Sequence, residues 1–232
     1  MERNMNKFYA KYLNIEVTRR CNMKCKHCLR GDAQDVDIDF RYIDNLLKHF
    51  QSVQYLGITG GEPSMNPKAI AYILDTCKKY DIHVNRFDIV TNGSETSMSD
   101  EFIAVCKDLY DYQENDESSD HDHMLELSDD KYHNKKLHPQ VKAKLSPYPF
   151  FGVRGQSKDI FLLKQGRCTE GYEMPVFRIY LNDCDYVYGD IYLNAKGNIL
   201  NDCNFSYDNQ DNLSLCSAEN FLEYIYTTLR TE

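Results

Sequence analysis

Residues 12–28 read YLNIEVTRRCNMKCKHC, and residues 54–63 read QYLGITGGEP. In both segments apolar and polar residues nearly alternate and β-branched residues are frequent, a pattern typical of a β-strand. A third segment of this kind, FDIVTNG, spans residues 87–93. The patterned part of each segment predicts a strand. The three strands lead, in order, into a cysteine cluster, a glycine pair with a glutamate, and an Asn-Gly pair.

Helical patterns lie between and after these strands. The apolar residues at helical spacing are Phe40, Ile43, Leu47 and Phe50 in the first predicted helix, Ile70, Ile73, Leu74 and Cys77 in the second, and Phe102, Val105, Cys106 and Leu109 in the third. Asp37 or Asp39 can cap the first helix, and Asn66 with Pro67 can open the second. This alternation predicts parallel strands joined by right-handed crossovers, with functional loops at the carboxyl ends of the strands.

The second half of the chain is less regular. Residues 111–123 are acidic and poor in apolar residues, which predicts a loop before a fourth strand at residues 124–127. Further on, the segments FFGVR, DIFLL, FRIYL and DIYLNAKGNIL predict strands or hairpins. Phe221, Ile225 and Leu229 recur at helical spacing and predict a closing amphipathic helix.

Length and composition fit one core with an appended section. The chain has 232 residues, of which 42% are hydrophobic and 27% charged, so it can bury a substantial core. No linker rich in glycine, serine or proline divides it. We therefore expect a core over residues 1–165, and a C-terminal section over residues 166–232 that completes or caps this core on the substrate side.

Hydropathy and charge limit the possible partners. The mean hydropathy is -0.62, and no apolar run reaches the roughly 18 residues of a membrane span. The first residues also lack the apolar stretch of a signal peptide. We expect a soluble, cytoplasmic protein with no membrane partner. Since the net charge is -9, a nucleic-acid partner is not expected either.

The cysteine cluster points to a metal centre. Cys21, Cys25 and Cys28 have the spacing Cys-x3-Cys-x2-Cys, which lets three thiolates converge locally. Structural zinc sites and ordinary iron-sulfur clusters take four protein ligands. With three ligands, a [4Fe-4S] cluster would keep one iron open for another molecule. The alternative is a noncatalytic zinc-binding module whose site is completed by a distant histidine or cysteine, and three unrelated thiols are a further possibility.

In order, spacing and strand context, CNMKCKHC (residues 21–28) and TGGEP (residues 59–63) resemble the radical S-adenosylmethionine (radical SAM) enzyme superfamily. The resemblance covers about the first 130 residues. The fold it implies is α/β, a partial (β/α)6 TIM-like barrel of the radical SAM type that is open on one side, here with a short C-terminal extension. It also implies that Cys21, Cys25 and Cys28 each bind one iron of a [4Fe-4S] cluster, while SAM chelates the fourth iron.

The resemblance further implies a set of SAM-binding residues. Glycines 60 and 61 would let the backbone approach the methionyl amino group, and Glu62, followed by Pro63, would add a negative charge beside it. Glu62 could equally be a carboxylate that caps a helix or stabilises a loop.

Three more residues are implied by the same resemblance. His27 would pack by the adenine, although it could also be a hydrogen-bonding residue behind the site. Asn92 would bond SAM, with a simple turn residue as the alternative. Ser128 would contact the ribose, with helix capping by Ser128 or Asp129 as the alternative. No catalytic side chain is assigned.

The implied activity is reductive cleavage of SAM. The reduced cluster would give methionine and a 5′-deoxyadenosyl radical that abstracts a hydrogen atom from a substrate. A low-potential donor such as a flavodoxin or ferredoxin would supply the electron, and oxygen would damage the cluster. We favour modification of a peptide or protein side chain over chemistry on a small molecule or nucleoside. The sequence does not reveal whether SAM is consumed or regenerated.

Six of the nine cysteines lie outside the cluster motif. Cys77 and Cys106 lie on apolar helix faces and are expected to be small buried residues. The other four are Cys168, Cys184, Cys203 and Cys216. Many relatives that modify peptides carry a second cluster in this region, but the spacing around Gly197 exceeds the corresponding signature by one residue. Isolated thiols are therefore the expectation, with a second cluster left open.

Overall fold

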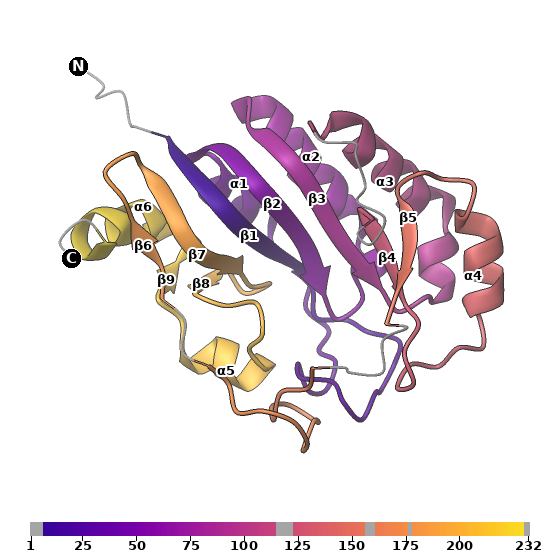
Figure 1. Cartoon of the computed structure of the whole chain (residues 1–232). Coiled ribbons are helices and arrows are strands. Elements are labelled where there is room, and N and C mark those ends of the chain that lie inside the picture. Colours follow the sequence, from indigo (N-terminus) through magenta and orange to yellow (C-terminus); the bar gives the residue numbers. More distant parts are fainter. Residues whose placement is uncertain (1–6, 115–122, 156–160, 176–177, 230–232) are drawn as a thin grey trace.

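The structure, a computed structural model, describes residues 7–114, 123–155, 161–175 and 178–229. Its central feature is one nine-stranded sheet with the order β5-β4-β3-β2-β1-β7-β8-β9, to which β6 adds by pairing with β7 (Figure 1). The strands are β1 (Phe8–Thr18), β2 (Phe50–Gly60), β3 (His83–Thr91), β4 (Leu125–Ser128), β5 (Phe151–Arg154), β6 (Tyr180–Leu181), β7 (Tyr186–Leu193), β8 (Asn198–Leu200) and β9 (Cys216–Ser217). The first five strands and β7 are parallel, whereas β6, β8 and β9 pair in antiparallel fashion.

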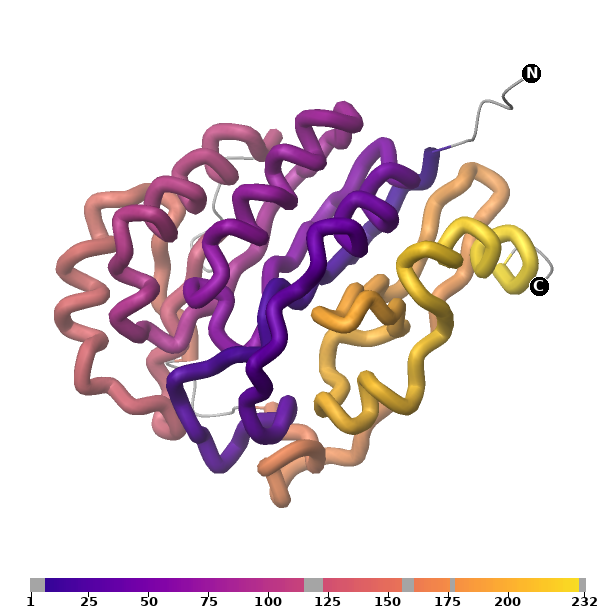
Figure 2. Tube along the Cα trace, turned by 180° about the vertical axis from the view of Figure 1, so that it is seen from behind, coloured from indigo at the N-terminus to yellow at the C-terminus, as the bar shows by residue number. Residues whose placement is uncertain are grey.

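Helices cover one face of this sheet (Figure 2). They are α1 (Phe40–Leu47), α2 (Pro67–Tyr80), α3 (Asp100–Tyr112), α4 (His138–Leu145) and α6 (Phe221–Tyr224). The short helix α5 (Tyr207–Asn212) lies instead beside the loops at the strand ends (Figure 1), and short helical turns are present at Pro63–Met65, Glu95–Met98, Ala218–Asn220 and Ile225–Leu229. Each of α1 to α4 connects two consecutive parallel strands, as the alternating pattern predicts. The core lies between the helices and the outer face of the sheet, and it includes all four apolar residues predicted for α3.

The sheet remains open, which confirms the predicted α/β partial barrel. Its sixth parallel strand, β7, pairs with β1 rather than with β5. The loops at the carboxyl ends of the parallel strands gather at one end of the molecule, together with α5 (Figure 1). The strand β7 comes from the predicted C-terminal section but lies in the same sheet as the core strands, and the division at residue 165 stays a prediction.

The first helix is shorter than its pattern predicts. Asp39 caps it by accepting a hydrogen bond from the amide of Arg41, but the helix ends at Leu47. Phe50 instead begins β2, where it pairs with Phe8 and is fully buried. The assignment of Phe50 to the helix was wrong because a single aromatic residue at helical spacing fits the start of a buried strand equally well. For the second helix, Asn66 does accept from the amide of Ala69.

The later predictions have mixed outcomes. The hairpin predicted in DIYLNAKGNIL is present as β7 and β8, and Phe221, Ile225 and Leu229 are all buried in the closing helical segment. In DIFLL, residues 159–160 lie outside the described residues, and the described remainder forms only the isolated bridge of Leu163 with Tyr172. Most of the predicted acidic loop, residues 115–122, also lies outside them. Among the helices of the described residues, none combines the length and apolar composition of a membrane-spanning segment.

Candidate functional site

A pocket of about 270 Å³ lies where the ends of β1 to β4 meet. The predicted SAM-binding residues that line it are His27, Gly60, Gly61, Glu62, Pro63, Asn92 and Ser128, joined by Cys28 of the cluster motif. Its other lining residues are Leu29, Arg30, Thr59, Val90, Thr91 and His133. The structure thus brings together residues that four separate strands deliver.

The glycine pair brings the loop after β2 against the end of β1. The amide of Gly61 donates to the carbonyl of Thr18, and that of Glu62 donates to the carbonyl of Arg20, each at 2.8 Å. A Cβ atom on Gly60 would lie 2.4 Å from the Thr18 oxygen, and one on Gly61 would lie 2.3 Å from the Arg20 oxygen. Both positions therefore require glycine for contact with the cysteine loop. The predicted approach to SAM is a separate matter, which this contact does not test.

Glu62 is buried and anchors the loop internally. Its carboxylate accepts hydrogen bonds from Ser64 Oγ at 2.6 Å, Thr91 Oγ1 at 2.8 Å and the Asn92 amide at 2.8 Å, and it caps the short helical turn Pro63–Met65. Burial raises the pKa of Glu62, although these hydrogen bonds oppose the shift. The alternative role of Glu62 as a capping carboxylate is therefore present in the structure, and it ties β2 to β3 at the pocket.

Asn92 has an unused acceptor at the pocket. Its side-chain amide donates to Asn22 Oδ1 at 3.0 Å and to Cys21 Sγ at 3.7 Å. Its Oδ1 atom is buried and has no hydrogen-bond partner among the described residues. Because an unpaired buried acceptor is costly, Oδ1 fits a donor group of a bound molecule, such as the amino or hydroxyl groups of SAM.

His138, which the sequence did not single out, and Asp129, which was named only as a possible helix cap, support Asn92 on the side away from the pocket. His138 is buried, with Nε2 3.2 Å from the Asn92 carbonyl oxygen and Nδ1 3.1 Å from Asp129. Lys135 and Lys142, together with His138, hold the pKa of Asp129 well below its usual range. Asp129 follows Ser128 directly, but no sequence pattern connects it with His138, which lies in α4.

The three cysteines of the motif lie half-buried in the loop after β1. Met23 donates its amide to Cys21 Sγ at 3.4 Å. Burial, with further effects from Glu62 and the other two thiols, raises the pKa of Cys21 to about 11. Burial and the nearby Cys28 raise the pKa of Cys25 as well. The thiols are close enough to affect one another, and a bound iron-sulfur core would stabilise their thiolate forms.

His27 lines the same pocket and contacts two other aromatic rings. Its ring stacks on Tyr132 at 4.6 Å and meets His133 edge-on at 5.0 Å. Burial and the proximity of His133 lower the pKa of His27, which favours a neutral ring. This flat aromatic group suits packing beside adenine, as the resemblance implies. His133 lies within the predicted SDDKYH segment, but its place in the pocket was not predicted.

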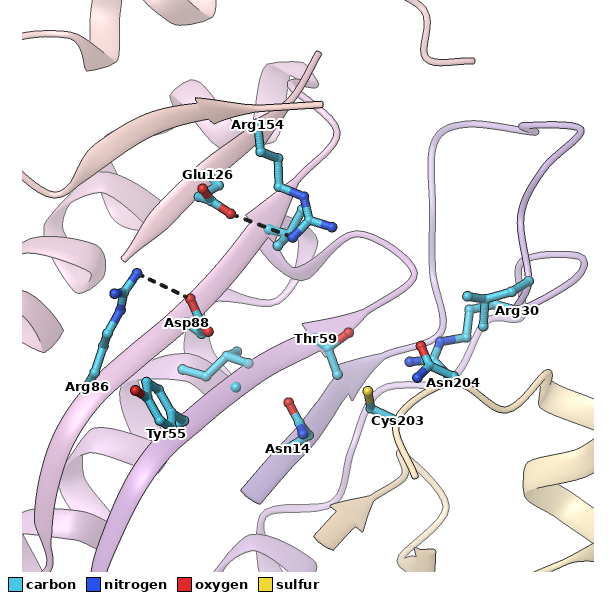
Figure 3. Close-up of a pocket in the computed structure, with 14 residues that line it drawn as sticks. Asn14, Arg30, Tyr55, Thr59, Arg86, Asp88, Glu126, Arg154, Cys203 and Asn204 are labelled. Carbon is cyan, nitrogen blue, oxygen red and sulfur yellow. Dashed lines mark ion pairs between the residues drawn. The ribbon is translucent and has the colours of Figure 1, made fainter. Parts of the chain in front are cut away.

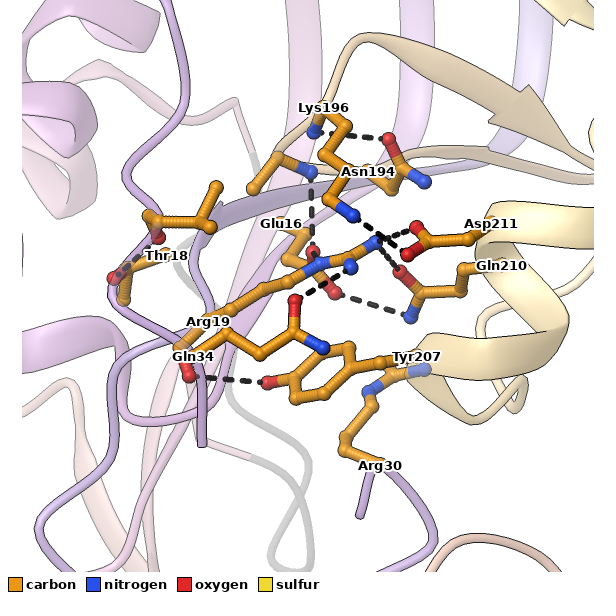
Figure 4. A network of polar contacts seen from close by, with 12 residues as sticks. Glu16, Thr18, Arg19, Arg30, Gln34, Asn194, Lys196, Tyr207, Gln210 and Asp211 are labelled. Carbon is orange, nitrogen blue, oxygen red and sulfur yellow. Dashed lines mark hydrogen bonds and ion pairs between the residues drawn. The ribbon is translucent and has the colours of Figure 1, made fainter. Parts of the chain in front are cut away.

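A buried network joins the cysteine loop to the C-terminal section (Figure 4). Arg19 is fully buried, and its guanidinium donates to Glu16, Gln34, Gln210 and Asp211 at 2.9 to 3.0 Å. Burial opposes the charge, but the bonds to Asp211 and Glu16 outweigh this effect and raise the pKa of Arg19. Arg19 lies two residues before Cys21, so the network fixes the start of the cysteine loop.

Glu16 is the central acceptor of the same network. It accepts from Tyr192 Oη at 2.6 Å, from the Ala195 amide at 3.1 Å and from Gln210 Nε2 at 3.1 Å. Both charges are therefore paired and fully hydrogen-bonded, as a buried ion pair requires. The sequence reveals the alternation around Glu16 but not its partners in the C-terminal section, which lie more than 170 residues away.

A second cavity, of about 430 Å³, lies against the inner face of the sheet (Figure 3). It shares Leu29, Arg30, Thr59 and Val90 with the pocket at the strand ends, so the two are contiguous. Its other lining residues are Asn14, Tyr55, Gly57, Ile58, Arg86, Asp88, Glu126, Arg154, Cys203 and Asn204. The inner face is therefore polar and charged, in contrast to the apolar face beneath the helices.

The four C-terminal cysteines occupy different places. Cys168 lies near His27, Cys184 is exposed in the turn before β7, Cys203 lines the second cavity, and Cys216 lies in β9. The Cys203 amide donates a hydrogen bond to the side chain of Asp190. Asp190 lies within β7, about 13 Å along the strand from Tyr186, where β7 begins. Cys184 and Cys203 are thus well separated, and isolated thiols remain the expectation. Cys77 and Cys106 are fully buried, as predicted.

Comparison with known proteins adds the family. Residues 15–113 match the family model of the Radical SAM superfamily. The chain is 31% identical over 103 residues to the uncharacterized protein MJ0907 of Methanocaldococcus jannaschii, covering 43% of this chain and 35% of that protein. It is 26% identical over 101 residues to GTP 3',8-cyclase of Rhizobium etli, covering 41% of this chain and 29% of that protein. The chain thus spans about a third of the length of these curated relatives.

The fold has a counterpart among solved structures. Native anSMEcpe with bound AdoMet and a Cp18Cys peptide superimposes with a TM-score of 0.58 at 11% sequence identity, covering 95% of this chain and 80% of that one. This likeness supports the fold. The matched family model assigns residues 15–113, which carry the two motifs on successive strand ends, to the radical SAM superfamily, whose members bind a [4Fe-4S] cluster and SAM.

Proposed function

We propose that the chain is an enzyme that cleaves SAM reductively at the pocket of the strand ends and directs the resulting radical to a substrate in the second cavity. One observation carries this proposal. The cysteine loop, the glycine pair with Glu62, and Asn92 meet at one pocket, where the buried Oδ1 of Asn92 lacks a donor. That pocket adjoins a polar cavity, with which it shares lining residues.

When bound, the reduced cluster supplies the electron that splits SAM into methionine and a 5′-deoxyadenosyl radical. The residues of the chain bind and orient these groups. Cys21, Cys25 and Cys28 would hold three irons, and Asn92 would accept from SAM through Oδ1. Glu62 holds the two strand ends in register, while Gly60 and Pro63 form the pocket wall.

The remaining pocket residues would orient the nucleoside part of SAM. His27 offers a flat, neutral ring that is already stacked on Tyr132, which suits adenine. Ser128, at the end of β4, offers a hydroxyl in the same pocket for the ribose. Thr59 and Val90 form the boundary between this pocket and the second cavity.

A peptide or protein side chain is the favoured substrate class. The inner face of the sheet is open and bears loosely paired charges, with Arg86 3.8 Å from Asp88 and Arg154 3.6 Å from Glu126. Such groups can recognise the backbone and polar side chains of a peptide. The likeness of fold to a protein whose structure holds a peptide is consistent with this choice. A small molecule or nucleotide is the other outcome of a substrate screen.

The electron donor would be a flavodoxin or ferredoxin. Lys24 and Lys26 are exposed between the cluster cysteines, on a chain whose net charge is -9. They give the cysteine loop a locally positive surface that suits an acidic electron-transfer protein. Reduction of the cluster by such a protein should therefore slow at high salt and in a Lys24→Gln, Lys26→Gln variant.

The test is 5′-deoxyadenosine formation by anaerobically reconstituted protein with SAM and dithionite. We expect product from the native chain and none from a variant with Cys21, Cys25 and Cys28 replaced by alanine. Iron and acid-labile sulfide should be present in the native protein and absent from the variant. One zinc ion per chain without sulfide would contradict the proposal and favour the zinc-binding module.

The substrate class is tested in the same assay. Mixtures of short peptides are compared with mixtures of nucleotides for their effect on 5′-deoxyadenosine formation. We expect peptides to stimulate it and one peptide to change in mass. Stimulation by nucleotides alone would contradict the peptide assignment and leave the SAM chemistry intact.

A further inference from the structure

Cys203 is a thiol in the cavity next to the SAM pocket. It lies after β8 and lines the cavity together with Asn14, Arg30 and Thr59. Figure 3 shows its sulfur between the side chains of Asn14 and Arg30, on the side of the cavity opposite Arg86. Arg30 and Thr59 also line the SAM pocket, so Cys203 lies close to the boundary between the two spaces.

Its surroundings hold the thiol in place and keep it protonated. The Cys203 amide donates to Asp190 Oδ2 at 3.0 Å, and Asn14 Nδ2 donates to Asp190 Oδ1 at 2.6 Å. Burial and the negative charge of Asp190 raise the pKa of the Cys203 thiol, while Arg30 opposes this shift. The sulfur therefore keeps its hydrogen at neutral pH, which makes it a poor nucleophile.

A neutral thiol has another chemical use beside a radical. The S–H bond is weaker than the C–H bonds of saturated carbon, so a carbon-centred radical removes its hydrogen atom readily. Water cannot substitute, because its O–H bond is stronger than those C–H bonds. A thiol in the cavity next to the proposed SAM pocket is therefore in a position to quench a carbon-centred radical by hydrogen-atom transfer.

We propose that Cys203 is a catalytic hydrogen-atom donor, which passes its S–H hydrogen to a carbon-centred radical formed in the cavity. The inference rests on the proposed function, since that function generates the radical. The new C–H bond forms as the S–H bond breaks, leaving a thiyl radical on Cys203. One electron from the low-potential donor and one proton from water restore the thiol.

This step has consequences for the reaction. The substrate would lose a hydrogen atom to the SAM-derived radical and receive one from Cys203. The outcome is a net exchange or inversion at carbon, in which the new hydrogen derives from water because thiol hydrogens exchange with solvent. SAM would be consumed in each turnover, and two electrons would be needed.

The other thiols do not share this position. Cys77 and Cys106 are fully buried in α2 and α3, in the layer that covers the opposite face of the sheet. Cys216 lies in β9, is half-buried and lines neither the SAM pocket nor the second cavity. Cys216 therefore serves as the matched control.

The test needs no knowledge of the substrate. Reconstituted protein is incubated in D₂O with SAM and dithionite, without any thiol reagent, so that Cys203 carries deuterium. In this uncoupled reaction we expect a large share of the 5′-deoxyadenosine to be monodeuterated. Cys203→Ala and Cys203→Ser should lose the label while still forming 5′-deoxyadenosine, and Cys216→Ala should retain it. A nitrone spin trap should form its adduct on the peptide that contains Cys203.

Each failure has a distinct meaning. Unlabelled 5′-deoxyadenosine from the native protein would overturn the role of Cys203 and leave the proposed function intact. Label that persists in both Cys203 variants, or a nitrone adduct confined to other peptides, would overturn it as well. Absence of 5′-deoxyadenosine from native protein with a verified [4Fe-4S] cluster would overturn the proposed function itself.

Discussion

The pocket proposed to bind SAM (the SAM side) and the cavity proposed to bind the substrate (the substrate side) are built in different ways. On the SAM side, Gly61, Glu62 and Asn92 come directly after their strands and bond to one another or to the cysteine loop. On the substrate side, the cavity combines the inner faces of five strands with Cys203, which arrives from the C-terminal section. Local motifs therefore shape the proposed SAM pocket, whereas distant pairings shape the cavity that would bind the substrate.

The largest effect is expected on the SAM side. Cys25→Ala should abolish iron incorporation and 5′-deoxyadenosine formation, because the motif has no spare thiolate. Thermal unfolding of the metal-free chain should not change, since Cys25 is half-exposed in a loop. Iron and sulfide analysis, with calorimetry of the metal-free protein, measures both. Retention of a full cluster in Cys25→Ala would show that this side is not built as a three-cysteine site.

The link between the two sides is tested next. Arg19→Met leaves Glu16 buried without its cation, which should lower the free energy of unfolding by about 3–5 kcal/mol. Urea unfolding followed by circular dichroism measures the loss. Arg41→Met is the control, because its pair with Asp39 is exposed and should contribute less than about 1 kcal/mol. Equal losses in both variants would mean that the buried network does not hold the C-terminal section to the cysteine loop.

A smaller effect is expected at the contact of the glycine loop with the cysteine loop. In Gly61→Ala the added methyl group would meet backbone atoms of Arg20, which should cost about 1–3 kcal/mol and weaken SAM binding. Gly57→Ala is the matched control, because its methyl group would meet only the Asn14 side chain, which can rotate. Equilibrium dialysis of SAM and urea unfolding compare the two. A larger loss of SAM binding in Gly57→Ala would reverse our assignment of the two sides.

The smallest effect concerns pH on the substrate side. Burial, with a contribution from Asp190, raises the pKa of Asp202 from 3.8 to about 6. Between these values the folded chain holds a proton that the unfolded chain has released, so stability should fall as pH rises through this window. Asp202→Asn should remove this decline, and the exposed Asp183→Asn should not. Urea unfolding across the window measures it, and an identical pH profile for all three proteins would contradict the prediction.

The sequence correctly predicts that the motifs meet at one edge of the sheet, for a physical reason. Each motif continues its own strand without interruption, and the carboxyl ends of parallel strands meet at one edge of a sheet. The predicted positions of Gly60, Glu62, Asn92 and Ser128 around one pocket result from this rule alone. The roles of Glu62 and Gly61 in holding strand ends together depend on contacts that no spacing reveals.

The supporting residues and the sheet order lay beyond the sequence pattern. His138 supports Asn92 from a helix 46 residues further along the chain, and nothing in its local sequence indicates this. The pairing of β7 with β1 was not apparent, because alternation predicts a strand but not its neighbour. Phe50 was wrongly assigned to the first helix, because its spacing from Leu47 fits a helix face and a buried residue at the start of β2 can have the same spacing.

By itself, the sequence determined the strand and helix alternation, the cysteine motif and the residues at the strand ends, because these depend on short-range periodicity and spacing. Only the tertiary structure decided how the chain closes on itself. Arg19 donates a hydrogen bond to Gln210, and Asn14 donates one to Asp190, in each case to a residue more than 170 positions away in the sequence. Such pairings depend on packing and on the burial of charge. The cavity that contains Cys203 exists only once those distant pairings have formed.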